Sequence, residues 1–318
     1  MSAPPWLDAD TWYTAGDVYY NARTGVAQRT TPNRFREDGT TPRLSAATTG
    51  PWAVPLSALP AMLPTELQPL MPPGQSELLT VDMEQWGGSG PLFTAPHGVN
   101  LERDDKPDHL PEDFTTYLAR ACAASTSGSS LSWPVAALAL VTATEAPLPG
   151  ARDPNYLLFN ETEQNSWVVA LRHRLPDVGA SRMHFDVHGK RDLPDERDCD
   201  VGVGAVRGHM GDEAADAVAL ECSSALERVL DPAGFSVDNR PRLQGAWRSV
   251  PRCTLTQSSV RLGYTCVQLE LGYRLRQALG RDRALCMRVA AALAASAPAC
   301  IAACRRVRPP EPPHTPLA

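Results

Sequence analysis

Over the central two thirds of the chain, short apolar runs alternate with longer stretches of helical periodicity. The short runs predict strands at 91–95, 183–187 and 265–271, with a further one at 201–206. Helical spacing predicts helices at 111–124, 161–175, 211–230 and 282–295. The run at 135–142 fits either a buried strand or a helix. Strands that alternate with helices indicate an α/β fold, with a mixed, mostly parallel sheet flanked by helices.

The two ends of the chain lack this periodicity. Residues 1–75 are rich in proline and polar residues, so we expect an irregular N-terminal extension, partly ordered by its aromatics Trp6, Trp12, Tyr13, Tyr19 and Tyr20. The stretch 305–318 is proline-rich and is predicted to be a disordered tail. The chain is therefore divided into an extension (1–75), a main domain (76–304) and a tail (305–318).

Composition narrows the class of protein. Hydrophobic residues make up 43% of the 318 positions, enough for a core, and no run reaches the roughly 18 consecutive apolar residues of a membrane span. The N-terminus has no apolar signal segment, which predicts a cytoplasmic protein with free, buried cysteines. A net charge of -6 argues against nucleic-acid or membrane partners. The oligomeric state stays open.

The first chemical motif is PLFTAPHGVNLE. An apolar strand stops before His97, and Gly98 removes a side chain beside it. Glu102 follows five residues later, where a loop can return it to the same ion. Two ligands close in sequence and a third far away is the usual organisation of a catalytic zinc site.

The second motif is HFDVHGK, in which His184, Asp186 and His188 share one face of a strand. His188 ends the strand and is followed by a glycine. Asp186 is placed either to bind the metal or to orient an imidazole that does.

The third motif is TCVQLELG. Cys266, Gln268 and Glu270 share one face of this strand, and a carboxylate that ends an apolar run is costly unless it is paired, hydrated or functional. A general base is one such use. Each motif alone also fits an ordinary turn or polar strand face, so the weight lies on their combination. All three stand at the carboxyl ends of predicted strands, where open α/β sheets bind ligands, so we expect His97, His188 and Glu270 at the same edge of one sheet.

Together the motifs resemble the N-formylglutamate amidohydrolase-like branch of the zinc-carboxypeptidase superfamily, which is also similar to phage poly-γ-glutamate hydrolases. The resemblance covers roughly residues 90–297. It rests on His97-Gly98 with Glu102, on Asp186-Val187-His188-Gly189, and on Val267–Glu270 followed by Arg274 and Arg276. The segment Arg152–Asn155 resembles a substrate-holding segment of the family, but Tyr156 stands where an arginine is expected.

The resemblance implies a Zn²⁺-dependent amidohydrolase or carboxypeptidase-like enzyme for N-acyl amino acids or small glutamyl or peptide-like substrates. The implied metal ligands are His97, Glu102 and His188. Glu270 is the expected general base, and Asp186 orients an imidazole. Arg152, Arg182 or Arg191 could bind a substrate carboxylate, with Asn155 nearby, and the sequence does not choose among the arginines.

Other classes fit less well. A catalytically inactive binding or scaffold protein that retains the fold is the main alternative. A nucleotide-binding enzyme has only Gly202 and Gly204 in its favour, without a third glycine or a P-loop lysine, and the HExxH motif of metalloproteases is absent.

Overall fold

The computed structural model describes residues 89–133, 151–174, 183–246 and 252–307, together with the backbone of five strands nearer the N-terminus. Four of those five strands form a sheet in the order β3-β2-β1-β4. They are β1 (Trp12–Ala15), β2 (Val18–Asn21), β3 (Ala27–Gln28) and β4 (Ala53–Pro55). From the sequence we expected this region to be irregular and partly ordered by its aromatic residues, and we did not expect a sheet.

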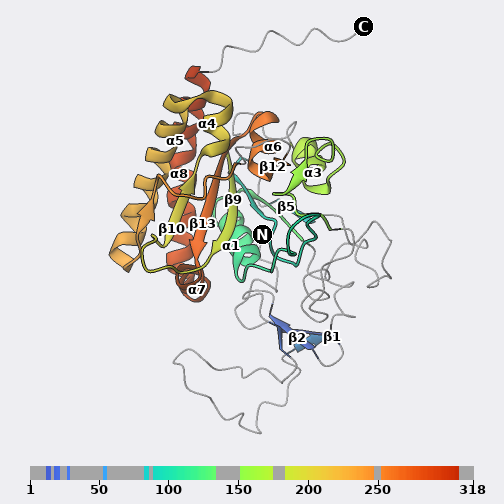
Figure 1. Ribbon diagram of the computed structural model, residues 1–318. Coiled ribbons are helices and arrows are strands. Elements are labelled where there is room, and N and C mark those ends of the chain that lie inside the picture. Colours follow the sequence, from blue (N-terminus) through green and yellow to red (C-terminus); the bar gives the residue numbers. More distant parts are fainter. Residues whose placement is uncertain are drawn as a thin grey trace.

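The centre of the protein is a seven-stranded mixed sheet in the order β11-β10-β13-β9-β6-β7-β5 (Figure 1). Its four central strands, β13, β9, β6 and β7, are parallel to one another, while β10 and β5 pair with them antiparallel. The strands are β5 (Asp82–Gln85), β6 (Leu92–Ala95), β7 (Ser129–Ser132), β9 (Met183–Lys190), β10 (Cys199–Gly202), β11 (Val237–Asp238) and β13 (Thr265–Gly272). A separate two-stranded pairing joins β8 (Leu157–Leu158) and β12 (Arg252–Cys253).

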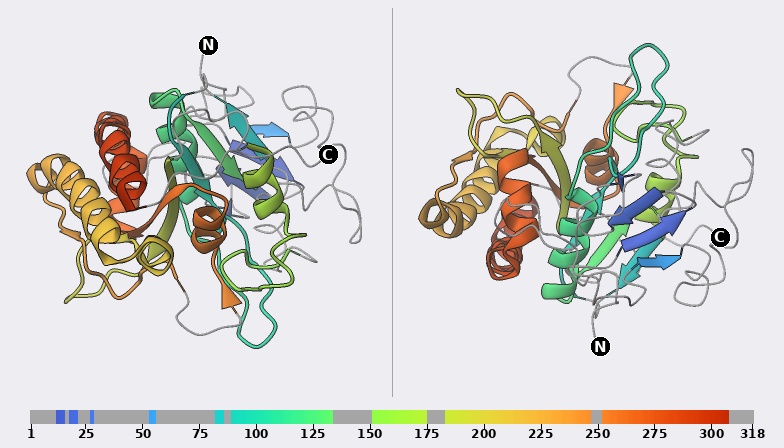
Figure 2. Two further views of the ribbon diagram at one scale, coloured as in Figure 1. Left: turned by 90° about the horizontal axis from the view of Figure 1, so that it is seen from above. Right: turned by 90° about the horizontal axis from the view of Figure 1, so that it is seen from below.

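Helices cover both faces of this sheet (Figure 2). On one face lie α1 (Thr115–Ser125), α5 (Asp212–Leu230), α7 (Tyr273–Arg281) and α8 (Arg283–Val307), which pack on one another and on β9 and β13. On the other face lie α3 (Ser166–Arg174) and α6 (Leu255–Arg261), while α4 (Gly204–Met210) bridges α5 and α6. Helix α6 begins at a capping box in which Thr254 and Gln257 exchange hydrogen bonds.

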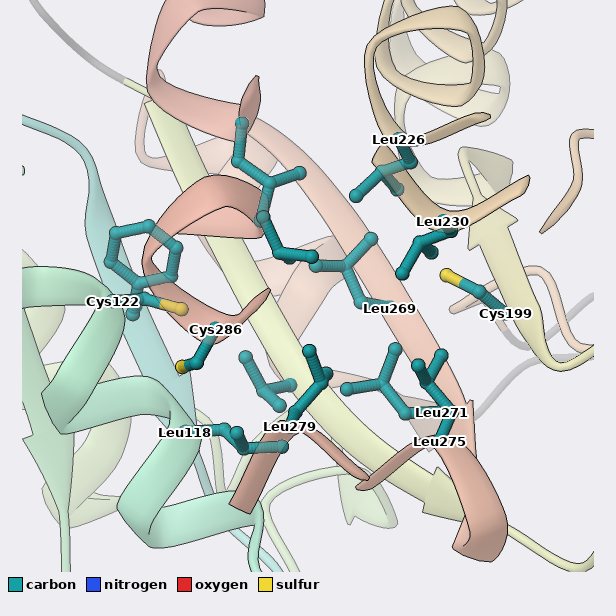
Figure 3. Close-up of a pocket in the computed structure, with 14 residues that line it drawn as sticks. Leu118, Cys122, Cys199, Leu226, Leu230, Leu269, Leu271, Leu275, Leu279 and Cys286 are labelled. Atoms are coloured by element: carbon teal, nitrogen blue, oxygen red, sulfur yellow. The ribbon is translucent and has the colours of Figure 1, made fainter. Parts of the chain in front are cut away.

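Alternate residues of β9 and β13 divide between these two faces. Met183, Phe185 and Val187 join Val267 and Leu269 in the main apolar core beneath α1, α5 and α8. A void of about 20 Å³ remains in this core, lined by leucines and by Cys122, Cys199 and Cys286 (Figure 3). The polar residues of the two strands therefore point to the α3–α6 side, as the alternation predicted.

All eight cysteines are free and buried, as expected from the sequence. Helix α8 is long and apolar enough to cross a membrane, with a mean hydropathy of 1.7 over its best window. Half of this apolar stretch of the helix is buried against the rest of the protein, and Val289, Leu293 and Cys300 lie in the core. Inside this fold α8 is thus a core helix. A cytoplasmic location stays a prediction.

The structure confirms the α/β class and the mixed, mostly parallel sheet. It confirms the strands at 91–95, 183–187 and 265–271 and the helix at 211–230. The helix predicted from Pro111 begins only at Thr115, and the strand predicted at 201–206 ends at Gly202, where α4 follows. Helix α8 extends to Val307, into the predicted tail. The run at 135–142 lies outside the described residues.

Candidate metal centre

Two histidines approach each other because their strands are neighbours. His97 follows β6, and His188 lies near the carboxyl end of β9, which pairs with β6 in parallel. Both are buried, with 4% and 1% of their surface exposed. Their Nδ1 atoms lie 3.0 Å apart.

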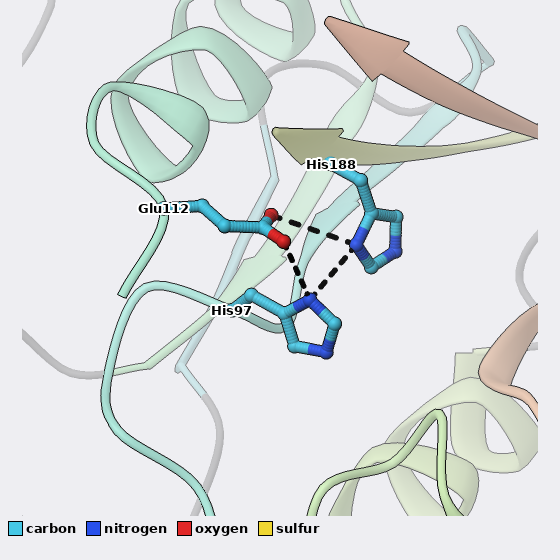
Figure 4. Close-up of side chains that lie close together, drawn as sticks. All are labelled: His97, Glu112 and His188. Atoms are coloured by element: carbon cyan, nitrogen blue, oxygen red, sulfur yellow. Dashed lines mark hydrogen bonds and ion pairs between the residues drawn. The ribbon is translucent and has the colours of Figure 1, made fainter. Parts of the chain in front are cut away.

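Glu112, on the loop before α1, completes the group (Figure 4). Its Oε1 lies 2.9 Å from His97 Nδ1, and its Oε2 lies 3.6 Å from His188 Nδ1. The main-chain N–H of Gly189 donates to Oε2 at 2.7 Å, which holds the carboxylate over the end of β9. Three potential ligands from separate segments therefore converge on one point.

Each histidine has a buried carboxylate on its other ring nitrogen. His97 Nε2 is 3.0 Å from Asp153 Oδ1, and His188 Nε2 is 3.0 Å from Asp186 Oδ2. A carboxylate so close to a ring nitrogen favours a proton on that nitrogen, which leaves the Nδ1 lone pair for the centre of the group. The His97–Asp153 contact is a hydrogen bond of the kind that metal-binding histidines typically make through their other ring nitrogen. His188 and Asp186 form an ion pair at the same distance, without the geometry of a hydrogen bond.

A chain of hydrogen bonds on the side of Asp186 away from His188 holds this carboxylate in place. Thr94 Oγ1 donates to Asp186 Oδ1 and lies 2.8 Å from His184 Nε2, and His184 Nδ1 lies 2.8 Å from Ser259 Oγ. Burial lowers the pKa of His184 to about 4, so its ring is neutral near pH 7. The neutral ring then donates from Nε2 to Thr94 and accepts at Nδ1 from Ser259. His184 thus supports the orientation of Asp186.

The charges of the group suit a divalent cation. Burial alone would lower the pKa of His97, but the carboxylates of Glu112 and Asp153 raise it to about 9. Burial alone would raise the pKa of Glu112, but His97 and His188 hold it well below its usual range. The Nδ1 atoms of His97 and His188 face each other at 3.0 Å, so their lone pairs would repel unless a proton lay between them. A metal ion can take the place of that proton.

The spacing also fits a metal. Ligands held about 2.0–2.2 Å from one tetrahedral zinc lie roughly 3.3–3.6 Å from one another. The three pairs of ligand atoms here are 2.9, 3.0 and 3.6 Å apart, so small movements would bring them to that geometry. His97, Glu112 and His188 therefore form a group that can hold a metal ion.

Glu270 stands beside the group. It pairs in register with His188 across β13 and β9, and both residues line a cleft of about 680 Å³ that also contains His97 and Glu112. Burial raises the pKa of Glu270 to about 7, although His188 opposes the shift. The prediction that His97, His188 and Glu270 end strands at the same edge of one sheet is confirmed.

Of the other residues that the sequence suggested, some line this cleft and some do not. Glu102 lies outside the group. Its main chain forms hydrogen bonds with Ala151 and Asp153, and the charge of its carboxylate helps to raise the pKa of Arg152. Arg152 forms ion pairs with Asp104 and Glu161 and is not among the residues that line the cleft.

Asn155 and Arg191 do line the cleft. Asn155 Nδ2 lies 3.2 Å from His188 Nε2, and its Oδ1 accepts from the main-chain N–H of Leu255. Asp186 is fully buried beneath His188 and does not line the cleft, which fits an orienting role better than that of a base. Arg182 lies outside the described residues.

Sequence reasoning missed Glu112 and Asp153. Asp153 stands between Arg152 and Asn155, the two residues of that segment that the sequence suggested for substrate binding, and its carboxylate was the available signal. Glu112 follows Pro111 at the predicted start of a helix, where an acidic residue is ordinary. Only the tertiary course of the loop reveals its place.

Comparison with known proteins gives distant structural matches. No family model and no curated protein matches the chain. A bacteriophage poly-γ-glutamate hydrolase is 14% identical over 69% of this chain and 88% of its own, with a TM-score of 0.36. YNDL, in its zinc-free apo form, is 13% identical over 63% and 75%, with a TM-score of 0.32. Likenesses this distant assign no activity.

Proposed function

We propose that the protein is a zinc-dependent hydrolase of an amide bond, with His97, Glu112 and His188 as its metal ligands. The observation that carries the proposal is the convergence of these three side chains, each histidine backed by its own buried carboxylate. Two nitrogens and one carboxylate oxygen form a donor set that zinc prefers, and they leave a position open for water or substrate.

The residues of the cleft have distinct tasks in this reaction. A zinc ion held by His97, Glu112 and His188 would act as a Lewis acid and would lower the pKa of a water molecule bound to it towards ~7. Glu270, whose pKa of about 7 suits both gain and loss of a proton, accepts a proton from water and returns it to the leaving amine. Asp153 and Asp186 keep the two imidazoles in the orientation that presents Nδ1.

The substrate we propose is an N-acyl amino acid or a small glutamyl or peptide-like amide. Three arginines, Arg103, Arg191 and Arg242, line the cleft and offer charge to a substrate carboxylate. Asp153 already holds Arg103, with 2.6 Å between the ion-paired atoms. Arg191 and Arg242 are therefore the partners we favour, with Asn155 at the metal side.

The first arm of the test concerns metal. Wild-type protein reconstituted with zinc should hold about one zinc per chain, measured by elemental analysis after dialysis. His188→Ala should lose it, because one ligand of three is gone. His173→Ala, at an exposed position on α3, is the matched control and should keep it. Wild type that retains no zinc would contradict the proposal.

The second arm concerns rate, measured on a panel of N-formyl, N-acetyl and γ-glutamyl substrates. Glu270→Gln keeps the shape of the side chain but cannot accept a proton, so it should retain zinc and lose ~10²–10⁴ in kcat. A zinc-loaded wild type without turnover on any substrate would favour an inactive binding protein. A Glu270→Gln variant of full rate would place the base elsewhere.

A further inference from the structure

One buried arginine joins the segments that carry the candidate site. Arg276 lies in the first turn of α7, with 6% of its surface exposed. Its guanidinium donates to three main-chain carbonyls: Nη1 to Asp113 at 2.5 Å, Nε to Leu271 at 3.0 Å and Nη2 to Lys190 at 3.3 Å.

Each of those carbonyls belongs to a residue within two positions of a site residue. Asp113 follows Glu112, and Leu271 follows Glu270. Lys190 lies two residues beyond His188 on the same strand. One side chain thus connects the loop that carries Glu112 with the ends of β9 and β13.

Gly189 makes room for this arginine. A Cβ at position 189 would lie 2.5 Å from Arg276 Cζ and 2.7 Å from its Nη1. The main-chain N–H of Gly189 also donates to Glu112 Oε2 at 2.7 Å. The glycine after His188 therefore leaves space for the guanidinium and holds the third carboxylate at the same time.

We propose that Arg276 is a positioning residue, which holds the Glu112 loop against β9 and β13 so that Glu112, His188 and Glu270 keep their places. This inference rests on the proposed metal site. It follows from the planar fork of arginine, which reaches three carbonyls in fixed directions. A lysine ammonium in its place is a point donor on a flexible stem and cannot reproduce that arrangement.

The test compares Arg276→Lys with Arg120→Lys. Arg120 is a matched control because it too is buried, with 1% exposed, and bonds to Ser132 Oγ and Trp133 O. In metal-free protein, exchange of the Gly189 amide, measured by NMR, reports whether Glu112 still accepts its hydrogen bond. We expect faster exchange in Arg276→Lys and no change in Arg120→Lys.

Zinc affinity, measured by competition with a chromophoric chelator, is the second readout. Arg276→Lys should bind zinc roughly 10–100-fold more weakly, the usual cost of losing support behind a ligand, and Arg120→Lys should match wild type. Unchanged amide exchange and affinity in Arg276→Lys would overturn the inference, as would equal losses in both variants. Wild type that binds no zinc would instead overturn the proposed function, while the exchange measurement still tests the positioning role.

Gly189→Ala gives a second route if Arg276→Lys does not fold, because it displaces the guanidinium and keeps the arginine. Gly208→Ala on α4 is its control, since a Cβ there meets no atom within 4 Å. We expect weaker zinc binding in the first variant alone. Equal affinity in the two variants would overturn the inference.

Discussion

At the scale of single residues, the site depends on which nitrogen of each histidine carries a proton. Asp153 and Asp186 lie at the Nε2 atoms of His97 and His188, and both carboxylates are buried. The cost of burying them is offset by charged partners. Burial would raise the pKa of Asp153, yet His97 and Arg103 lower it. The imidazoles are therefore oriented before any ion arrives.

The choice of third ligand can be tested with two conservative substitutions. Glu112→Gln removes the negative charge between the histidines, so zinc affinity should fall by at least about tenfold, or ~1.4 kcal/mol. Glu102→Gln should leave it within about threefold, because Glu102 lies outside the group. Chelator competition on both proteins measures the difference. If Glu102→Gln lost more zinc affinity than Glu112→Gln, Glu102 would be the third ligand instead.

A buried neutral histidine makes stability depend on pH. His184 has a pKa of about 4 in the folded protein and about 6.5 when unfolded, so between these values only the unfolded state binds the proton. Stability should fall as pH drops from 6.5 to 4, by up to about 3 kcal/mol from this group. Urea unfolding of metal-free wild type and His184→Gln measures it. Parallel pH profiles of the two proteins would contradict the assignment.

Residue patterns predicted part of the site. His97, His188 and Glu270 were found because strand ends and alternation are local properties of the chain. Glu112 was not, because its position depends on hydrogen bonds to Gly189, far away in sequence. The zinc ion, the base and the substrate residues stay predictions.

At the scale of elements, the loop before α1 is the critical piece. Phe114, two residues after Glu112, has a φ of 71°, a left-handed conformation unusual for a bulky residue. Its ring packs into the space that Gly280 leaves on α7. This conformation explains why α1 begins at Thr115 and not at Pro111, since a left-handed residue interrupts the helix.

Filling that space should disturb the site from a distance. In Gly280→Ala the new Cβ would lie 2.5 Å from Phe114 Cδ1, so the ring and its loop must move. We expect a loss of about 1–3 kcal/mol in stability, together with weaker zinc binding. Gly208→Ala, at an exposed helical position, should be neutral or stabilising by up to ~1 kcal/mol. Thermal unfolding and chelator competition measure both effects, and identical behaviour of the two variants would contradict this role for the loop.

At the scale of the whole molecule, the alternation of strands and helices was enough to predict an α/β sheet with the site at its carboxyl edge. It missed β7, because Ser129, Ser130 and Ser132 make this buried strand look like a polar loop. It also missed α6 and α7, which are short. Periodicity detects an element only when its length and its apolar face are both sufficient.

The division of the chain at residue 75 leads to the last prediction. Within the described part of the chain, the main apolar core runs from Phe93 to Cys304, and the earliest strand of the large sheet is β5, which starts at Asp82. A protein lacking residues 1–75 keeps all of these elements, so it should fold and bind zinc as wild type does. A protein lacking residues 1–88 loses β5 and leaves β7 as an edge strand that pairs only with β6, so it should be less stable and more prone to aggregate. Urea unfolding, solubility and zinc affinity of the two truncations decide the matter. If removal of residues 1–75 alone abolishes soluble protein, the extension belongs to the folding unit, and the core must depend on contacts made by those first residues.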